Sequence, residues 1–181
     1  MTPLVVAHRH GPLLRVVQRG WQAPLDPSYA RREGGRWNAP GSFPVLYTCC
    51  SERVARAVVY GRLQRAAVVL ADLLDAARPQ LVEIAWSGSL VDAISSGGLA
   101  AVGLPDAYPD DVGYDGTRPL GATWAGSGHE GVVCRSAAIS RTGLRSWSGD
   151  HRPWGEAALF VANTSRPPRL LRRRPDLEWL R

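Results

Sequence analysis

The stretch GGRWNAPG at residues 34–41 places three glycines and a proline within eight positions. Glycine is too flexible and proline too restricted for such a segment to form a helix or a central strand, so the sequence predicts a loop here. The loop displays Arg36, Trp37 and Asn38. A simple turn more often carries small polar residues, whereas this one has a guanidinium beside a large aromatic ring. Two interpretations fit: a ligand-binding loop, or an arginine stacked on a tryptophan at the surface.

Short segments rich in β-branched and apolar residues predict strands on both sides of this loop. They lie at residues 13–19, 43–48, 81–86, 131–136 and 157–161. The residues between the first strand and the glycine-rich loop are polar and contain prolines, and we expect them to be loop as well.

The clearest helix follows Ser51, which is a favourable N-cap. Apolar residues recur there at helical spacing, and the pattern resumes over residues 68–74 before it stops at Pro79. Residues 87–123 are rich in glycine, serine, aspartate and proline and are predicted to be mostly loop, with at most one short helix. Because the chain has 181 residues, of which 45% are hydrophobic, we expect one domain, residues 1–181, with its own core.

The net charge is +6, and all 22 basic residues are arginines. Arginine offers planar, bidentate donors that suit phosphate and carboxylate groups. Nucleic acid, an acidic protein and a pyrophosphate-bearing small molecule are therefore all candidate partners. The tail at residues 169–174 has four arginines, but without interleaved aromatic residues it indicates a solvated edge element rather than a nucleic-acid grip.

The three cysteines do not form a metal-binding motif. Cys49 and Cys50 are neighbours and Cys134 is far along the chain, so we expect neither a CxxC metal site nor a disulfide framework, and no metal cofactor. The first twenty residues lack a secretory pattern, and no apolar stretch is long enough to span a membrane. These features predict a cytoplasmic protein without a membrane partner.

Four segments together resemble the RES family in order and spacing. They are EGGRWNAPGSFPVLYTCCSERVARAVV, LVEIAW, TRPLGATWAGSGHEGVVCRSAA and GEAALFV, and the resemblance is strongest over residues 14–161, which leaves an arginine-rich extension at residues 162–181. The family is named for an arginine, a glutamate and a serine and comprises bacterial toxins that consume NAD. It implies an α+β domain similar to the ADP-ribosyltransferase fold, with a mixed sheet, flanking helices and an NAD cleft. It also implies an Xre-like antitoxin as partner; self-association is left open.

The resemblance assigns roles to residues of this sequence. Arg19 and Ser136 match catalytic positions, and Arg36, Trp37 and Tyr47 match the NAD-binding segment. These residue types suit NAD, because guanidinium groups bind pyrophosphate, aromatic rings stack on nicotinamide, and short polar side chains reach ribose hydroxyls.

One position departs from the family pattern. The family glutamate, which stabilises positive charge as the glycosidic bond breaks, falls on Val58. Glu52 lies six residues earlier and should point elsewhere on the same helix, so Glu130 and Glu156 are the carboxylates that remain to replace it. We favour Glu156, which precedes a buried-looking strand, although a strand-end carboxylate in water or paired with arginine has the same appearance.

Two functions follow from these observations. The first is an enzyme that cleaves the nicotinamide glycosidic bond of NAD and passes ADP-ribose to phosphate, water or a protein side chain. The second is a binding or regulatory module that keeps the fold but has lost turnover because Val58 replaces the glutamate.

Overall fold

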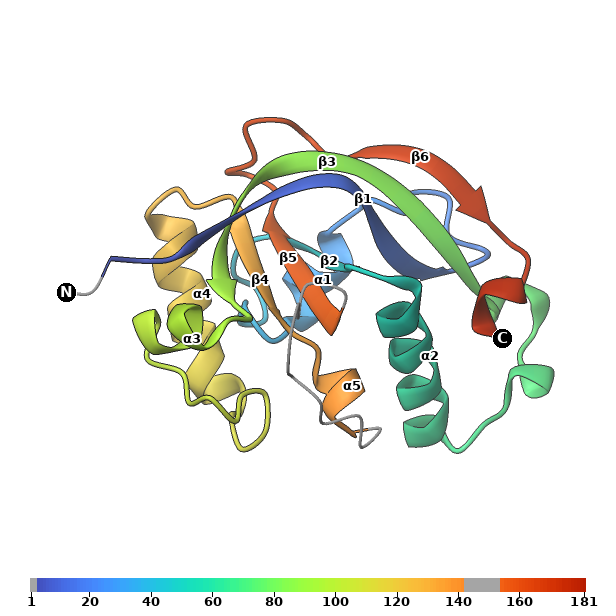
Figure 1. Cartoon of the computed structure of the whole chain (residues 1–181). Coiled ribbons are helices and arrows are strands. Elements are labelled where there is room, and N and C mark those ends of the chain that lie inside the picture. The colour runs from blue at the N-terminus through green and yellow to red at the C-terminus, as the bar shows by residue number, and fades with distance from the viewer. Residues whose placement is uncertain (1–2, 142–153) are drawn as a thin grey trace.

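The computed structural model describes residues 3–141 and 154–181, and within them six strands form one mixed sheet (Figure 1). The strands are β1 (Val6–Gln18), β2 (Val45–Cys49), β3 (Pro79–Ala93), β4 (Gly131–Arg135), β5 (Gly155–Phe160) and β6 (Arg169–Arg174). Their order is β1-β2-β5-β4-β3-β6, and β1 also pairs with β3. The β3–β4 pair is parallel, whereas β1–β2, β1–β3, β2–β5, β4–β5 and β3–β6 are antiparallel.

The long pair of β1 and β3 gives the sheet its curvature. The two strands pair from Val6 opposite Val91 to Gln18 opposite Pro79, and in Figure 1 they arch over β4, β5 and β2. Because β1 pairs with both β2 and β3, the strands β1, β2, β5, β4 and β3 form a closed ring of pairings. This ring encloses one apolar cluster. Its buried members are Leu13, Val17, Leu46, Val82, Ile84, Trp86, Leu90, Ile94, Val133, Ala157 and Leu159.

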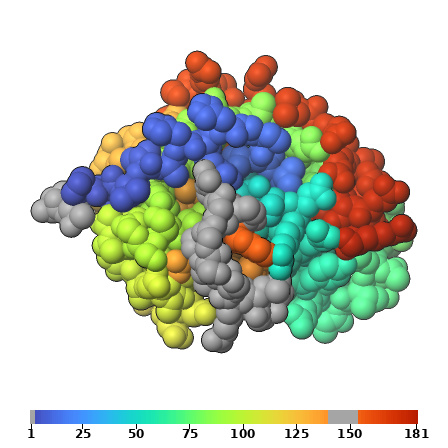
Figure 2. Space-filling model, viewed as in Figure 1, coloured from blue at the N-terminus to red at the C-terminus, as the bar shows by residue number. Residues whose placement is uncertain are grey.

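Helices cover the sheet at two ends. They are α1 (Ser28–Glu33), α2 (Glu52–Ala66), α3 (Ser96–Ala101), α4 (Tyr114–Gly126) and α5 (Ala137–Arg141). Figure 1 shows α3 and α4 at one end, and α2 with the C-terminus at the other. In the space-filling view (Figure 2), β1 crosses the upper part of this face and the C-terminal segment covers its right edge. The predicted single α+β domain with flanking helices is confirmed.

The predicted helix after Ser51 is confirmed as α2. The Ser51 hydroxyl accepts a hydrogen bond from the Val54 N–H at 3.3 Å, as an N-cap should. The helix ends at Ala66, because Ala67 adopts a left-handed conformation with φ of 53°. The apolar pattern at 68–74 therefore falls on the short 3₁₀ turn Leu70–Asp72 and its flanking residues, and not on a continuation of the helix; a second 3₁₀ turn, Asp75–Ala77, follows.

The prediction of a mostly looped segment at residues 87–123 is wrong. Strand β3 continues to Ala93, because residues 87–91 pair with the first residues of β1, and α3 and α4 follow. Glycine and serine have weak intrinsic strand preference, but long-range pairing overrides it. Helix α1 was also missed by the sequence pattern, since six residues are too few to show helical periodicity.

The arginine-rich C-terminal segment is part of the fold. Strand β6 lies at the edge of the sheet beside β3, where the Arg172 guanidinium donates to the Glu83 carboxylate at 2.5 Å. Beyond it, Trp179 and Leu180 are buried against α2 and Leu81 of β3. Across the described part of the chain, no helix has the length and apolar character to cross a membrane.

Candidate functional site

The glycine-rich loop is held by a buried asparagine. Asn38 is fully buried, and its Nδ2 donates to the carbonyls of Ala30 at 2.8 Å and Phe43 at 3.2 Å. The Gly35 N–H donates to the Asn38 carbonyl at 2.9 Å, and Gly34 has a φ of 73°, which favours glycine. Asn38 therefore ties α1, the loop and the entry to β2 together.

Tyr47 of β2 completes this network. Its hydroxyl accepts from the Trp37 N–H at 2.9 Å and donates to Asn38 Oδ1 at 2.8 Å. Burial is the main cause that raises the pKa of Tyr47 above its ordinary value, so the hydroxyl remains a donor. A Cβ on Gly35 would lie 2.4 Å from this oxygen, so the close approach requires glycine. Tyr47, predicted to bind NAD, thus uses its hydroxyl to hold the loop.

Helix α4 packs against the other side of the loop. The Thr117 hydroxyl donates to the Arg36 carbonyl at 2.6 Å, and Arg118 Nε donates to the Gly35 carbonyl at 3.0 Å. A Cβ on Gly121 would lie 2.0 Å from the Trp37 carbonyl oxygen, so the helix approaches the loop backbone directly. Trp37 itself is buried, with its ring 5.4 Å from that of Trp124. The loop is therefore a rigid element of the core.

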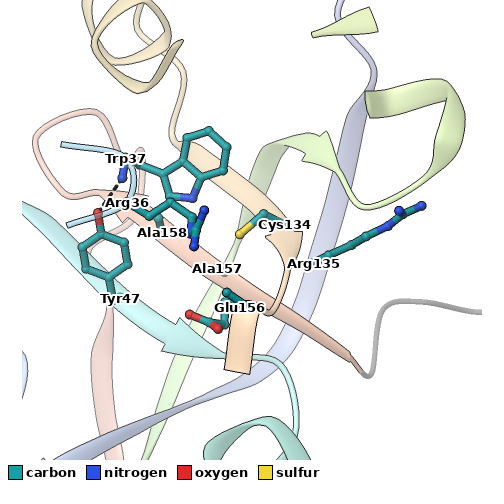
Figure 3. Close-up of a pocket in the computed structure, with 9 residues that line it drawn as sticks. Arg36, Trp37, Tyr47, Cys134, Arg135, Glu156, Ala157 and Ala158 are labelled. Atoms are coloured by element: carbon teal, nitrogen blue, oxygen red, sulfur yellow. Dashed lines mark hydrogen bonds between the residues drawn. The ribbon is translucent and has the colours of Figure 1, made fainter. Parts of the chain in front are cut away.

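A small cavity lies between this loop and strands β2, β4 and β5 (Figure 3). It is lined by Arg36, Trp37, Tyr47, Cys134, Arg135, Ala137, Glu156, Ala157 and Ala158. Its volume of about 20 Å³ suffices for about one water molecule. Arg36 Nη1 donates to the Val112 carbonyl at 3.2 Å, so a larger ligand requires the guanidinium to exchange this partner.

Strand pairing brings Ser136 and Glu156 together at one end of the cavity. Cys134 of β4 pairs with Glu156 of β5, and the Ser136 hydroxyl donates to Glu156 Oε1 at 2.5 Å. Ser136 is fully buried, and its Oγ accepts from the Ala138 N–H at 3.2 Å, where α5 begins. The serine therefore fixes the position of the carboxylate.

Most of the residues predicted for the site converge. Arg36, Trp37, Tyr47 and Glu156 line the cavity, and Ser136 contacts Glu156. In Figure 3, the side chain of Arg135 extends away from this group; its Nε donates to the Ile94 carbonyl at 2.8 Å.

Arg19 is the exception, because it does not line the cavity. Strand β1 ends one residue before it, and its guanidinium forms an ion pair with Asp75 and donates to the Pro175 carbonyl at 2.6 Å. Asp75 lies shortly before the first residue of β3, and Pro175 directly follows the last residue of β6. These two strand ends are adjacent in the sheet, because Leu81 pairs with Arg174. The structure thus separates Arg19 from Arg36, Ser136 and Glu156.

Arg15, which the sequence reasoning missed, is the buried arginine of β1. It is 8% exposed, and its Nη1 has no hydrogen-bond partner among the described residues. Burial is the main cause that lowers the pKa of Arg15 to about 10, followed by Arg62, so it remains charged at neutral pH. The sequence carried one sign of this burial: along the strand, Arg15 falls on the same side as Leu13 and Val17, both of which point into the core.

The other carboxylates considered for the site lie elsewhere. Glu52 is paired with Arg174, and Glu130 accepts from the Ser89 N–H at 2.7 Å and from the Ser165 hydroxyl at 2.6 Å. Val58 is partly buried and packs against the cluster that joins α2, α5 and the C-terminal turn. Of these three glutamates, Glu156 is the one that lines the cavity.

The Cys134 thiol in the cavity wall is kept in its neutral form. Burial, followed by the nearby Glu156, raises the pKa of Cys134 to about 12, so the thiolate is scarce at neutral pH. All three cysteines are free thiols. In the described ranges, no group of three or more histidine, cysteine, aspartate or glutamate side chains could hold a metal ion.

This chain is similar to a known protein family in sequence and to a solved structure in fold. A family model described as the RES domain matches residues 12–171. A chain in the crystal structure of the M. tuberculosis MbcT–MbcA toxin–antitoxin complex is similar, with a TM-score of 0.72 and 24% identity over 93% of this chain and 85% of that chain. The curated proteins contained no match. The structural similarity shows that this chain shares its α+β fold with that chain.

Proposed function

The chain belongs to the RES domain family, and from that premise we propose that it is the toxin component of a toxin–antitoxin pair that binds NAD and cleaves its nicotinamide glycosidic bond. The observation that carries this proposal is the contact of Ser136 with Glu156 in the cavity that also contains Arg36. The cavity therefore has a guanidinium that can bind an anion and a carboxylate that is oriented by a hydrogen bond.

The roles follow from charge. As the bond between nicotinamide and ribose breaks, positive charge develops on the ribose, and a fixed carboxylate stabilises it. Glu156 takes this role, and the hydrogen bond from Ser136 holds its carboxylate at the cavity. Arg36 exchanges the Val112 carbonyl for a phosphate oxygen of NAD, which is a stronger, charge-assisted partner. ADP-ribose then passes to phosphate, water or a protein side chain.

The direct test is nicotinamide release. The purified full-length chain should release nicotinamide from NAD, and a comparison with and without inorganic phosphate should distinguish a phosphorylase from a glycohydrolase. Absence of both release and NAD binding at millimolar NAD would refute the proposal.

A second function is favoured by Val58. An apolar side chain at the family glutamate position, packed against α5, suits a binding or regulatory module that has lost turnover. Calorimetric titration separates the two functions: NAD binding without consumption supports this second one.

The expected partner is an antitoxin. The solved neighbour comes from a toxin–antitoxin complex, and the net charge of +6 favours an acidic inhibitory segment that covers the cavity. We expect an Xre-like protein in this role, and co-purification from the native host tests it.

Arg15 and Arg19 should differ in their effects on turnover. We expect Arg15→Gln to lower kcat/KM for NAD by about tenfold, because Arg15 follows Leu14, which pairs with Cys49, and Cys49 pairs in turn with Glu156, so the buried charge acts on the proposed carboxylate across the sheet. Arg19→Gln should change it less than about twofold, since its guanidinium is tied to Asp75. Nicotinamide-release kinetics measure both, on protein whose folding is verified by urea unfolding. Equal losses in the two variants would contradict the assignment.

A further inference from the structure

Two arginines converge on one tyrosine ring beside the cavity. The guanidinium carbon of Arg118 lies 4.4 Å from the centroid of the Tyr114 ring, and that of Arg36 lies 5.9 Å from the same centroid. Tyr114 begins α4 and is half exposed. Arg36 lines the cavity, so the cluster of Arg36, Tyr114 and Arg118 adjoins the cavity through Arg36.

Neither guanidinium of this cluster has a carboxylate partner among the described residues. Their side-chain hydrogen bonds go to neutral carbonyl oxygens, from Arg36 to Val112 and from Arg118 to Gly35. Other arginines of the chain do find carboxylates, as Arg172 does with Glu83 and Arg174 with Glu52. Glu156 lines the cavity with Arg36, but within the described ranges neither guanidinium is ion-paired, so an anion that contacts both of them would gain attraction from each charge.

The Tyr114 ring explains how the charges stay together. An aromatic face attracts a cation and limits the directions in which the planar guanidinium can lie. The hydrogen bond from Arg118 Nε to the loop fixes one edge of its guanidinium and leaves its terminal nitrogens for a ligand. Arg118 is thus oriented for a ligand, whereas Arg36 joins it by exchanging the Val112 carbonyl.

We propose that Arg118, oriented by Tyr114, acts with Arg36 as a subsite for the diphosphate group of the dinucleotide. A diphosphate carries charges on two phosphorus centres, which matches two guanidinium groups. This inference rests on the proposed function, because it names the part of NAD that the cluster contacts. It adds Arg118 and Tyr114 to the residues that bind the ligand.

Isothermal titration of the full-length chain with three ligands tests the proposal. ADP-ribose and NAD contain the diphosphate, whereas nicotinamide riboside has no phosphate. We expect Arg118→Gln to weaken binding of NAD and ADP-ribose by about tenfold to a hundredfold and to leave nicotinamide riboside unaffected. Raising the salt concentration should weaken ADP-ribose binding more in the wild type than in this variant.

Matched variants separate charge from structure. Arg32→Gln removes a guanidinium that stacks on another exposed tyrosine, Tyr29, and should not change binding. Thr117→Val breaks the other hydrogen bond between α4 and the loop without changing charge, so a loosened loop would weaken all ligands alike. Tyr114→Phe should retain wild-type affinity and Tyr114→Ala should lose it.

The outcomes distinguish the two levels of inference. If the wild type binds neither NAD nor ADP-ribose, the proposed function fails. If it binds both and Arg118→Gln binds them equally well, or loses affinity for nicotinamide riboside to the same extent, the diphosphate subsite is overturned and NAD binding stands.

Discussion

Replacing Glu156 by glutamine should lower the rate of nicotinamide release from NAD by about 10²- to 10³-fold. The amide keeps the size of the side chain but removes the negative charge that stabilises the developing ribose cation. Because Ser136 donates to the carboxylate at 2.5 Å, the hydroxyl can still donate to the amide oxygen, and the local structure should persist. The measurement is the single-turnover rate at saturating NAD, together with the affinity for ADP-ribose, which should change little.

Two variants control this result. Glu52→Gln removes a carboxylate on α2 that is paired with Arg174 outside the cavity, and its rate should equal that of the wild type. Ser136→Ala keeps the carboxylate but frees it from its donor, and we expect a loss of about tenfold. A Glu156→Gln protein that turns over NAD at the wild-type rate would remove Glu156 from the mechanism and leave the missing family glutamate unreplaced.

Asn38→Ala should lower the free energy of unfolding by about 2–4 kcal/mol. The side chain is fully buried and hydrogen-bonds to the Ala30 and Phe43 carbonyls and to the Tyr47 hydroxyl. Its removal leaves these groups buried without a partner, which is more costly than losing an exposed hydrogen bond. Urea unfolding of the variant, followed by tryptophan fluorescence, measures the change.

The same network predicts coupling between Asn38 and Tyr47. Tyr47→Phe alone should cost about 1–2 kcal/mol, and the double variant should be less destabilised than the sum by about 1 kcal/mol, because the two residues share a hydrogen bond. Asn163→Ala is a matched control: its Nδ2 also donates to two carbonyls, but it is only partly buried and water can replace it. Equal costs at Asn38 and Asn163 would mean that the network does not anchor the loop.

Several parts of the fold were predictable because neighbouring residues determine them. Three glycines and a proline prevent regular structure at residues 34–41 wherever the segment lies. Ser51 caps α2 through a contact only three residues away. The strand predictions at 43–48, 131–136 and 157–161 also agree with β2, β4 and β5 to within two residues at each end.

The errors occurred where distant partners decide the conformation. Residues 87–91 contain glycine and serine yet form a strand, because β1 supplies their hydrogen bonds from about eighty residues earlier in the chain. Likewise, Arg15 and Arg19 lie four residues apart, and the alternation of Arg15 with Leu13 and Val17 alone did not decide which of the two arginines is buried. The pairing of β1 with β3 places Arg15 inside, and the end of the strand leaves Arg19 to Asp75.

The sequence by itself determined the family, the loop and the chemical types available for the site, because these depend on which residues occur and in what order. Only the tertiary structure decided which of them meet. It joined Ser136 to Glu156 and both to Arg36, and it turned the Tyr47 hydroxyl toward the loop. The physical reason is that strand register and helix packing fix contacts between residues as much as 156 positions apart, as between Arg19 and Pro175, and no local preference encodes such contacts.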